Sequence, residues 1–325
     1  MGGLSQKAHT IDKIRKNTAG RAITVDAGNP LFRLRGRYGF GSVEYISAQA
    51  VADIYTLLGF DAVAIGPNDL AGGLGLLLET ADQGIPWTSA NIYDHRGQRI
   101  FASFRLKNID DLSIAIVGLT DPATIQSKDF VIKDATAVLA DLLPELAESS
   151  DLILVLAAMP IAAIMDLVEQ FPRVDIVIAG DTSKGNLAPF LAGTTLVTQT
   201  GNRGRYQGVM SVSWTGQPWG KDTASSLADL RKRLKANSAQ LHRLQNNPLD
   251  AGSKKDKIAQ LEESRTEIIE QIEHLEKQQR SGLAATDVST YENRFLPLSP
   301  SGRADPQVDY IIREAKKRMA AGGRK

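Results

Sequence analysis

The sequence predicts an α/β protein. Its pattern indicates a sandwich of two mixed sheets, with an antiparallel coiled-coil hairpin inserted near the C-terminal end. Two observations support this fold class. Over residues 1–220, short apolar runs that stop at glycine, asparagine or proline alternate with segments of helical periodicity, as in partly parallel sheets covered by helices. Over residues 221–282, heptad-spaced leucine and isoleucine in a highly charged segment predict two long helices.

The composition fits a folded protein and excludes several kinds of chemistry. Of the 325 residues, 42% are hydrophobic, and no apolar run is long enough to cross a membrane. Cysteine is absent, which excludes disulfides, thiolate catalysis, iron–sulfur clusters and cysteine zinc sites. The net charge of +1 gives no bulk attraction for nucleic acid or anionic lipid.

The elements of the first domain, residues 1–220, follow from local pattern. Helices are predicted at 5–16, 43–58, 134–148 and 161–169. Strands are predicted at 21–26, 61–65, 85–92, 100–106, 112–119, 152–156, 174–179, 194–200 and 208–214. Several of these strands end directly at turn residues, which is typical of strands that lead into functional loops.

The second domain, residues 221–282, changes character, because 22 of the 61 residues 221–281 are charged. Apolar side chains occupy the a and d positions of two segments separated by a break at 246–253: Leu227, Leu230, Leu234, Leu241 and Leu244, then Ile258, Leu261, Ile268, Ile272 and Leu275. The pattern predicts a helical hairpin that either packs only on itself or serves as an arm for docking or dimerisation. Residues 283–325 are expected to return to the α/β domain with a strand at 292–298 and a helix from Asp305.

Polar residues gather in the loops that follow the predicted strands, where α/β proteins carry their chemistry. Three of these loops, with the strand between them, read DAGN at 26–29, GPNDLAGG at 66–73, IAIVGLT at 114–120 and GDTS at 180–183. Their order and spacing, after an opening Gly2-Gly3-Leu4, resemble the N-terminal domain of the 5′-nucleotidase branch of calcineurin-like metallophosphoesterases, and most of all a divergent bacterial branch of it.

The resemblance implies a metallophosphoesterase fold with a two-metal site, and it also implies that most reactive residues of that site are absent. The metal-bridging aspartate would fall on Asn29, and a metal-binding asparagine on Pro67. The histidine that assists the leaving group would fall on Asn68, and a strand-end histidine on Ala158. Neither side chain can titrate near neutral pH, so the family's catalytic positions are degenerate here.

The last histidine pair of the family would fall on Asp181 and Ser183. The four histidines of the chain lie elsewhere, at His9, His95, His242 and His274, and are interpreted as solvated structural residues.

Oxygen side chains that remain in the loops could hold a hard cation such as Mg²⁺ or Ca²⁺. The candidate ligands are Asp26, Asn29, Asp69 and Asp181. The alternative is that these residues cap helices and close turns. One divalent metal ion is therefore the only cofactor that the sequence suggests.

A glycine-rich segment, GRYGFG at 36–41, contains Arg37 and directly follows two more arginines, Arg33 and Arg35. It does not join a strand to a helix as a dinucleotide-binding loop does. It is interpreted either as an anion-binding loop or as a solvated surface loop.

Three functions fit these observations. The first is a binding or scaffolding module with a degenerate metallophosphoesterase site, a pseudoenzyme. The second is an active phosphoester hydrolase that uses the residual oxygen ligands and one hard metal ion. The third is an assembly protein that binds a protein partner, or a second copy, through its coiled-coil arm. No nucleic-acid partner is expected.

The start of the chain carries a further expectation. The resembled family is usually exported and has a strand with a D-x-H motif before its GG-x-A helix, whereas Met1 directly precedes Gly2-Gly3-Leu4 and no signal peptide is recognisable. We expect either a cytoplasmic protein or a sequence whose natural beginning lies upstream.

Overall fold

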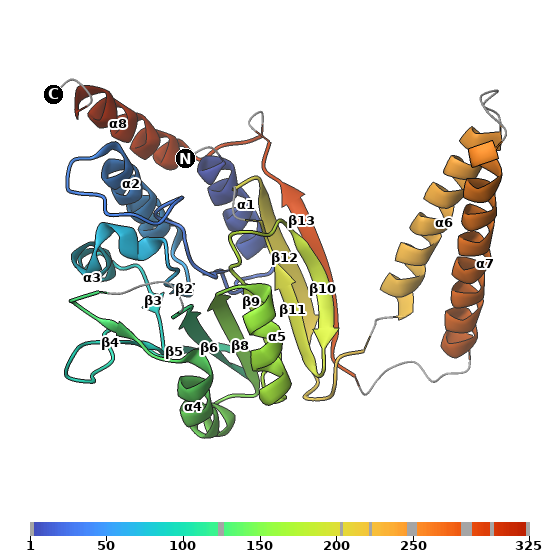
Figure 1. Cartoon of the computed structure of the whole chain (residues 1–325), viewed down its shortest axis with the longest axis horizontal. Coiled ribbons are helices and arrows are strands. Elements are labelled where there is room, and N and C mark those ends of the chain that lie inside the picture. The colour runs from blue at the N-terminus through green and yellow to red at the C-terminus, as the bar shows by residue number, and fades with distance from the viewer. Residues whose placement is uncertain are drawn as a thin grey trace. The chain divides into compact units, whose positions relative to one another are not determined.

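The computed structural model describes residues 3–122, 127–201, 204–220, 223–245, 252–280, 288–299 and 302–322 (Figure 1). It divides into two compact units, one formed by Met1–Val209 with Asn293–Lys325 and the other by Met210–Glu292. The first unit contains the α/β elements, and the second contains two long helices.

A six-stranded sheet forms the larger half of the first unit, with the strand order β10-β11-β9-β8-β6-β5. Its strands are β5 (Phe104–Ile109), β6 (Leu112–Thr120), β8 (Leu152–Ala158), β9 (Ile176–Ala179), β10 (Leu187–Ala192) and β11 (Thr195–Gln199). The four inner strands run parallel, and the edge strands β5 and β10 run antiparallel to their neighbours. Every residue of β8 is buried, which explains its continuous apolar sequence.

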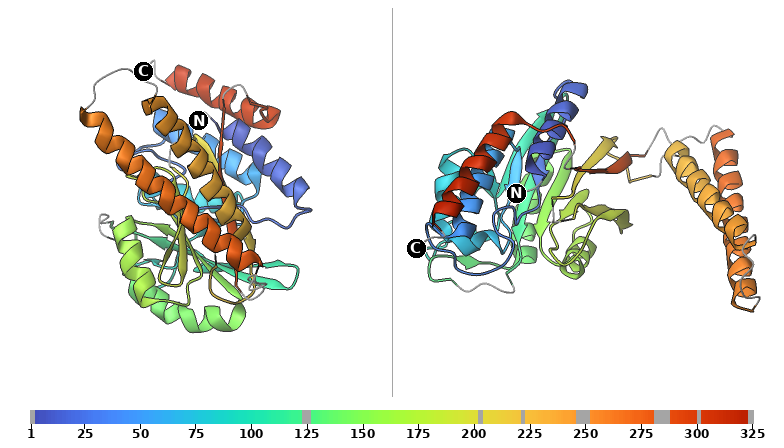
Figure 2. Two further views of the ribbon diagram at one scale, coloured as in Figure 1. Left: turned by 90° about the vertical axis from the view of Figure 1, so that its right-hand side faces the viewer. Right: turned by 90° about the horizontal axis from the view of Figure 1, so that it is seen from above.

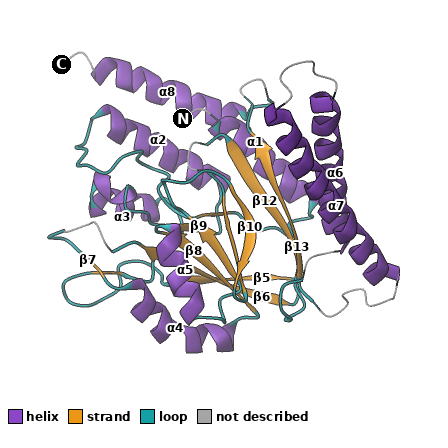
Figure 3. Ribbon diagram, turned by 45° about the vertical axis from the view of Figure 1, so that its right-hand side comes forward, coloured by secondary structure: helices purple, strands orange, loops and turns teal. Residues whose placement is uncertain are grey.

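Helices α4 (Ala135–Ser149) and α5 (Ile161–Gln170) pack on this sheet (Figure 3). Their apolar faces, including Leu139 and Ile164, share one buried cluster with Ile153 and Val177 of the strands. The Asp134 carboxylate caps α4 by accepting a hydrogen bond of 2.8 Å from the Ala137 N–H.

A second sheet is small and parallel, in the order β1-β2-β3. Its strands are β1 (Val25–Asp26), β2 (Ala62–Ala64) and β3 (Trp87–Thr88), and its helices are α1 (Leu4–Asn17), α2 (Val43–Leu58), α3 (Leu74–Asp82) and the 3₁₀ turn η1 (Asp69–Gly72). Ile54, Leu77 and Trp87 lie in its fully buried core. The C-terminal helix α8 (Pro306–Gly322) packs along α2 through Ala315 and Ile46.

The two sheets come into close contact at Gly118 of β6, where a side chain would collide with the carbonyl of Thr88. The Ala90 N–H donates to the Gly118 carbonyl at 2.8 Å, and the Thr120 hydroxyl donates to the Ile65 carbonyl at 2.7 Å. The predicted α/β architecture of packed sheets is confirmed, although the smaller sheet is parallel rather than mixed.

Some elements differ from the sequence prediction. The strand predicted at 85–92 is divided into β3 and β4 (Ile92–Tyr93) by a turn at 89–91, and β4 pairs with the short strand β7 (Val131–Ile132). Helix α3 and strand β10 were not predicted. Strands β12 (Tyr206–Ser213) and β13 (Thr290–Pro297) form a separate pair, near the predicted strands at 208–214 and 292–298.

The second unit is dominated by α6 (Thr223–Gln245) and α7 (Gly252–Arg280), which lie side by side (Figure 2). Arg231 pairs with Glu276 at 2.8 Å, and the Asn237 amide donates to the Leu261 carbonyl at 3.2 Å. Contacts from the start of one helix to the end of the other mean that the helices are antiparallel. The predicted domain limits at 221 and 282 lie outside the described residues, as do residues 246–251 of the predicted break at 246–253; its last two residues, Gly252 and Ser253, begin α7.

None of the helices in the described part of the chain is both long and apolar enough to cross a membrane.

Candidate functional site

Four loops that follow strands of both sheets meet at one place in the first unit. A Cβ atom added to Gly28, after β1, would lie 2.8 Å from the Gly66 nitrogen and 3.0 Å from the Ala158 Cβ. A Cβ atom added to Gly180, after β9, would lie 3.3 Å from the Ala158 Cα. The carboxyl ends of β1, β2, β8 and β9 therefore converge, as the sequence predicted, and they touch through main chain.

Asp69 joins two of these loops. Its Oδ2 accepts hydrogen bonds from the N–H groups of Asn29 at 2.7 Å and Gly66 at 2.9 Å, and its Oδ1 accepts one from the Leu31 N–H at 2.9 Å. The residue is fully buried. Burial raises the pKa of the Asp69 carboxyl to about 7, although the three N–H donors act in the opposite direction, and the nearby Asp26 charge raises it further.

Asn29 closes the same pair of loops from the other side. It adopts a left-handed backbone conformation with φ of 64°, which asparagine tolerates better than most residues. Its side-chain oxygen accepts a hydrogen bond of 2.8 Å from the Asn68 N–H, and its amide packs directly on Gly66. The Asn68 side chain in turn donates to the Arg33 carbonyl at 3.1 Å.

Asp26 lies at the end of β1 beside these residues. One oxygen accepts a hydrogen bond from the Gly28 N–H at 3.0 Å, and the other accepts one from the Tyr55 hydroxyl at 2.7 Å. The Lys7 ammonium lies 3.9 Å from the second oxygen and contacts the rings of Tyr55 and Phe60. Burial, followed by the Asp26 charge, holds the pKa of Tyr55 well above its ordinary value, so its hydroxyl stays a donor.

No pattern in the sequence predicts the contacts of Asp26 with Lys7 and Tyr55. Lys7 lies on α1 and Tyr55 on α2, and neither belongs to a motif.

Asp181 binds two segments at the opposite side of the converging loops. Its Oδ2 accepts a hydrogen bond from the Ile161 N–H at 3.0 Å, in the first turn of α5, and its Oδ1 accepts from the N–H and hydroxyl of Ser183 at 2.8 and 2.7 Å. Burial raises the pKa of Asp181, but these hydrogen bonds and the charge of Lys184 outweigh it, so the net pKa lies below its ordinary value. Gln199 fixes the backbone by bonding to both the N–H and the carbonyl of Asp181.

Asn91, another polar residue of these loops, is fully buried, and its side chain also forms hydrogen bonds with main-chain groups. Its amide donates to the carbonyls of Thr120 and Lys133 at 2.7 and 2.9 Å, and its oxygen accepts from the Thr120 N–H at 2.9 Å. Within the described ranges, no group of three or more histidine, aspartate or glutamate side chains is arranged to hold a metal ion.

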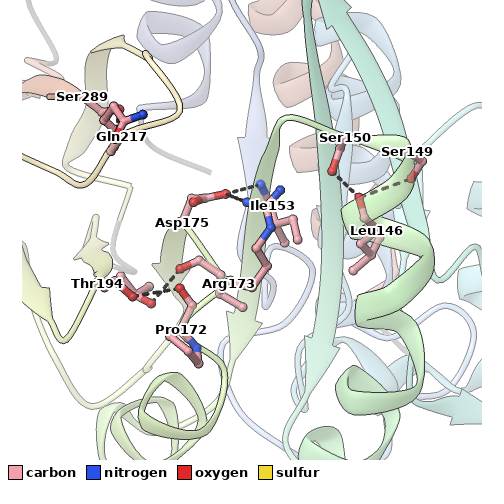
Figure 4. Close-up of polar contacts among 12 residues, drawn as sticks. Leu146, Ser149, Ser150, Ile153, Pro172, Arg173, Asp175, Thr194, Gln217 and Ser289 are labelled. Atoms are coloured by element: carbon pink, nitrogen blue, oxygen red, sulfur yellow. Dashed lines mark hydrogen bonds and ion pairs between the residues drawn. The ribbon is translucent and has the colours of Figure 1, made fainter. Parts of the chain in front are cut away.

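A buried carboxylate also lies away from these loops, where β9 begins. Asp175 points toward β8 and accepts a hydrogen bond of 2.8 Å from the Ile153 N–H, with the Arg173 guanidinium at 3.6 Å (Figure 4). Burial raises its pKa to about 6, against the lowering effects of Ile153 and Arg173. It lies at the amino end of the strand, so it belongs to the structural framework and not to the converging loops.

The converging loops thus bring Asp26, Asn29 and Asp69 together and place Asp181 across Gly180 from them. Each of the four predicted candidates has its side-chain oxygens in hydrogen bonds to protein donors, mostly backbone N–H groups. A carboxylate oxygen has two lone pairs, so a cation could share it, but the bonds orient the oxygens toward the loops they join.

Comparisons with known proteins place this arrangement in context. No family model matches the chain. The chain is 29% identical over 163 residues to a 5′-nucleotidase from Vibrio parahaemolyticus, an alignment that covers 46% of this chain and 28% of that protein. It is 32% identical over 134 residues to the protein UshA from Escherichia coli, covering 39% of this chain and 24% of that protein. The matches thus span only about a quarter of the length of these curated relatives.

Solved structures resemble the chain over nearly all of its length. The sulfate thiohydrolase SoxB from Thermus thermophilus has a TM-score of 0.68 at 13% identity, over 99% of this chain and 48% of that chain. A 5′-nucleotidase precursor from the same species has a TM-score of 0.65 at 15% identity, over 98% and 54%.

The calcineurin-like phosphoesterase YfkN from Bacillus subtilis has a TM-score of 0.62 at 13% identity, over 100% of this chain and 92% of that chain. These likenesses confirm the predicted resemblance: the chain has the α/β fold shared by 5′-nucleotidases and calcineurin-like metallophosphoesterases.

Proposed function

We propose that this chain is a pseudoenzyme, a protein with the 5′-nucleotidase and metallophosphoesterase fold that does not hydrolyse phosphate esters and acts as a binding or scaffolding module. The observation that carries the proposal is the environment of Asp69. Its carboxyl group is fully buried and accepts three backbone N–H groups from two loops. These contacts support a structural role for the residue, because the hydrogen bonds would have to be shared or broken to bind a cation.

The donor set supports the same proposal. A pair of catalytic metal ions needs carboxylate and imidazole ligands, including one carboxylate that bridges both ions. At the matched positions Asn29 offers one neutral oxygen that already accepts the Asn68 N–H, and Pro67 and Ala158 offer no side-chain donor. The residues therefore do not fit a metal pair, and we derive no hydrolytic step through one.

The experiment measures metal content and hydrolysis on the same sample of the full chain. The protein is incubated with Mn²⁺, Zn²⁺ or Mg²⁺, freed of unbound metal, analysed for bound metal, and assayed with p-nitrophenyl phosphate and a nucleoside 5′-monophosphate. We expect less than one bound ion per chain and no turnover above the protein-free rate.

The control variants are Asp26→Ala, at the converging loops, and Asp12→Ala, at an exposed ion pair on α1. Stoichiometric metal together with turnover that Asp26→Ala abolishes and Asp12→Ala retains would refute the proposal. That outcome would establish the alternative, an active hydrolase that uses the residual oxygen ligands and a hard divalent ion.

We further propose that the hairpin of α6 and α7 is a coiled-coil arm for a protein partner or for self-association. Leu230, Leu241 and Ile268 are buried in the described part of the hairpin, and the side-chain oxygen of Asn237 is buried with no hydrogen-bond partner among the described residues. A polar residue at a seam position favours a particular register or partner. The test compares the mass in solution of the full chain with that of a chain lacking residues 222–281; equal subunit numbers for both would contradict self-association.

A further inference from the structure

The loop between β1 and α2 presents charge and apolar surface together. We call residues 33–40 the arginine loop. Arg33, Arg35 and Arg37 are exposed, and Leu34 and Phe40 are 69% and 85% exposed. The sequence from 27 to 43 contains no acidic residue. Within the described residues, none of the three guanidinium groups makes an ion pair or a hydrogen bond, so their charge is uncompensated locally.

The arginine loop is anchored at its base. The ring of buried Phe32 stacks on Tyr38, with centroids 5.2 Å apart and planes 7° from parallel. The Tyr38 N–H donates to the Ala71 carbonyl at 3.0 Å, and the Asn68 amide holds the Arg33 carbonyl at 3.1 Å. The base of the loop is therefore held by Phe32, which is buried in the core, while the Leu34 side chain is exposed to solvent.

A second group of cationic side chains lies on the last turns of α8. Helix α2 begins at Val43, directly after the loop, and its first turns contact the last turns of α8: Ile46 packs with Ala315, and Arg318 donates to the Gln49 side chain at 3.1 Å. The loop and the C-terminal end of α8 lie at the same end of this unit in Figures 1 and 2.

Four cationic side chains in those last turns are exposed: Arg313, Lys316, Lys317 and Arg318. The acidic groups beside them include Glu44, in the first turn of α2, Asp53, whose carboxyl group interacts with the Arg318 charge, and Glu314, which pairs with Lys317 at 2.7 Å. Positive charge therefore predominates at this end, although the chain as a whole carries only +1.

We propose that the arginine loop docks the protein on an anionic lipid surface. Lipid headgroups would neutralise the arginines, while Leu34 and Phe40 would enter the interface between headgroups and acyl chains. A nucleic acid would complement the same charge, and a base could stack on Phe40, but the exposed aliphatic Leu34 has no such partner there, so the two side chains together favour lipid. The inference is independent of whether the converging loops bind metal or hydrolyse anything.

The test is sedimentation of the full chain with vesicles of phosphatidylcholine alone or with 30 mol% phosphatidylglycerol added, at about 0.1 M salt, where the screening length is about 10 Å. We expect binding only to the anionic vesicles, and weaker binding at higher salt. Each arginine near such a surface contributes about 1 kcal/mol, or about fivefold, so Arg33→Gln/Arg35→Gln/Arg37→Gln should lower the partition coefficient about 100-fold.

The matched control is Lys232→Gln/Arg233→Gln/Lys235→Gln, which removes the same charge from exposed positions of α6 and should bind as the natural chain does. Leu34→Ser/Phe40→Ser keeps the charge and should weaken binding at least tenfold, because the inserted apolar surface is lost. Circular dichroism of each variant confirms its fold.

Three outcomes overturn the proposal. The first is equal binding to both kinds of vesicle, or no binding at all. The second is an equal loss in the α6 control, which would make the effect one of net charge. The third is tighter binding to heparin or to a single-stranded oligonucleotide that survives Leu34→Ser/Phe40→Ser, which would assign the loop to a soluble polyanion.

Discussion

Replacing Asp69 with asparagine tests how far this one side chain stabilises the converging loops. The natural carboxyl group accepts three backbone N–H groups, from Asn29, Leu31 and Gly66. Asparagine has one acceptor oxygen, so at least one of these buried donors loses its partner, at a cost of about 1–3 kcal/mol. Alanine would leave all three unpaired, about 3–9 kcal/mol, which approaches the whole stability of a domain. Asp69→Asn is therefore the informative change.

The pH dependence of that difference gives a second, independent magnitude. Burial raises the folded-state pKa of Asp69 to about 7 from its ordinary value of 3.8. A group with a raised folded pKa contributes stability that is fully present below its unfolded pKa and is lost as pH rises through its folded pKa. Between pH 5 and pH 7 the free energy of unfolding of the natural chain should therefore fall by about 2 kcal/mol, whereas that of Asp69→Asn, which cannot titrate, should not change for this reason.

The assay is urea unfolding of both proteins, followed by circular dichroism, at pH 5, 6, 7 and 8. Asp175, whose pKa burial raises to about 6, acts in the same direction but is present in both proteins and cancels in the difference. We expect Asp69→Asn to be the less stable protein at pH 5 and the gap to narrow toward pH 7. A gap that stays constant over this range would refute the reasoning, because it would mean that Asp69 does not titrate there.

Three further predictions concern single contacts. Gly66→Ala should destabilise the chain by about 1–3 kcal/mol in urea unfolding, because the added methyl collides with the Asn29 side chain; the same change in an Asn29→Gly background should cost clearly less, and equal costs would contradict the collision. Tyr55→Phe removes the hydrogen bond to Asp26 and should cost about 1 kcal/mol in the same measurement, so a neutral effect would mean that this bond contributes nothing. Leu241→Asp places a charge in the buried seam of α6 and α7 and should reduce the helical signal at 222 nm while the apolar core of the first unit stays protected from hydrogen exchange; loss of protection throughout would show that the units unfold together.

Long elements with clear periodicity could be predicted from the sequence. Helix α2 has the predicted bounds because its ends carry their own signals: the Ser42 hydroxyl accepts the Tyr45 N–H at 3.1 Å, and Gly59 ends the helix at a φ of 58°. Strand β10 was missed because Pro189 interrupts its apolar run. The structure explains this, since β10 is an edge strand, where proline is tolerated.

The site was predictable only in part. Turn residues after apolar runs located the converging loops, since glycine, asparagine and aspartate mark strand ends. The partners of the polar side chains were not predictable, because Asp69 binds Leu31 from 38 residues away and Tyr55 binds Asp26 from 29 residues away. No local pattern encodes such pairs; they exist only once the two sheets are in register.

The contacts that hold the converging loops together have a consequence for how such a protein can change over time. Gly28 and Gly180 bring main chain close to main chain and to the small Ala158, so part of the inner wall of the loops is built without side chains. Substitutions can then accumulate at loop positions that do not join two segments, whereas Asp69 and Asn29, which join the loops, are retained. In such an arrangement the residues that maintain the fold are different from those that react. Reactive residues can therefore be replaced during evolution, with a change or a loss of activity, while the protein stays folded.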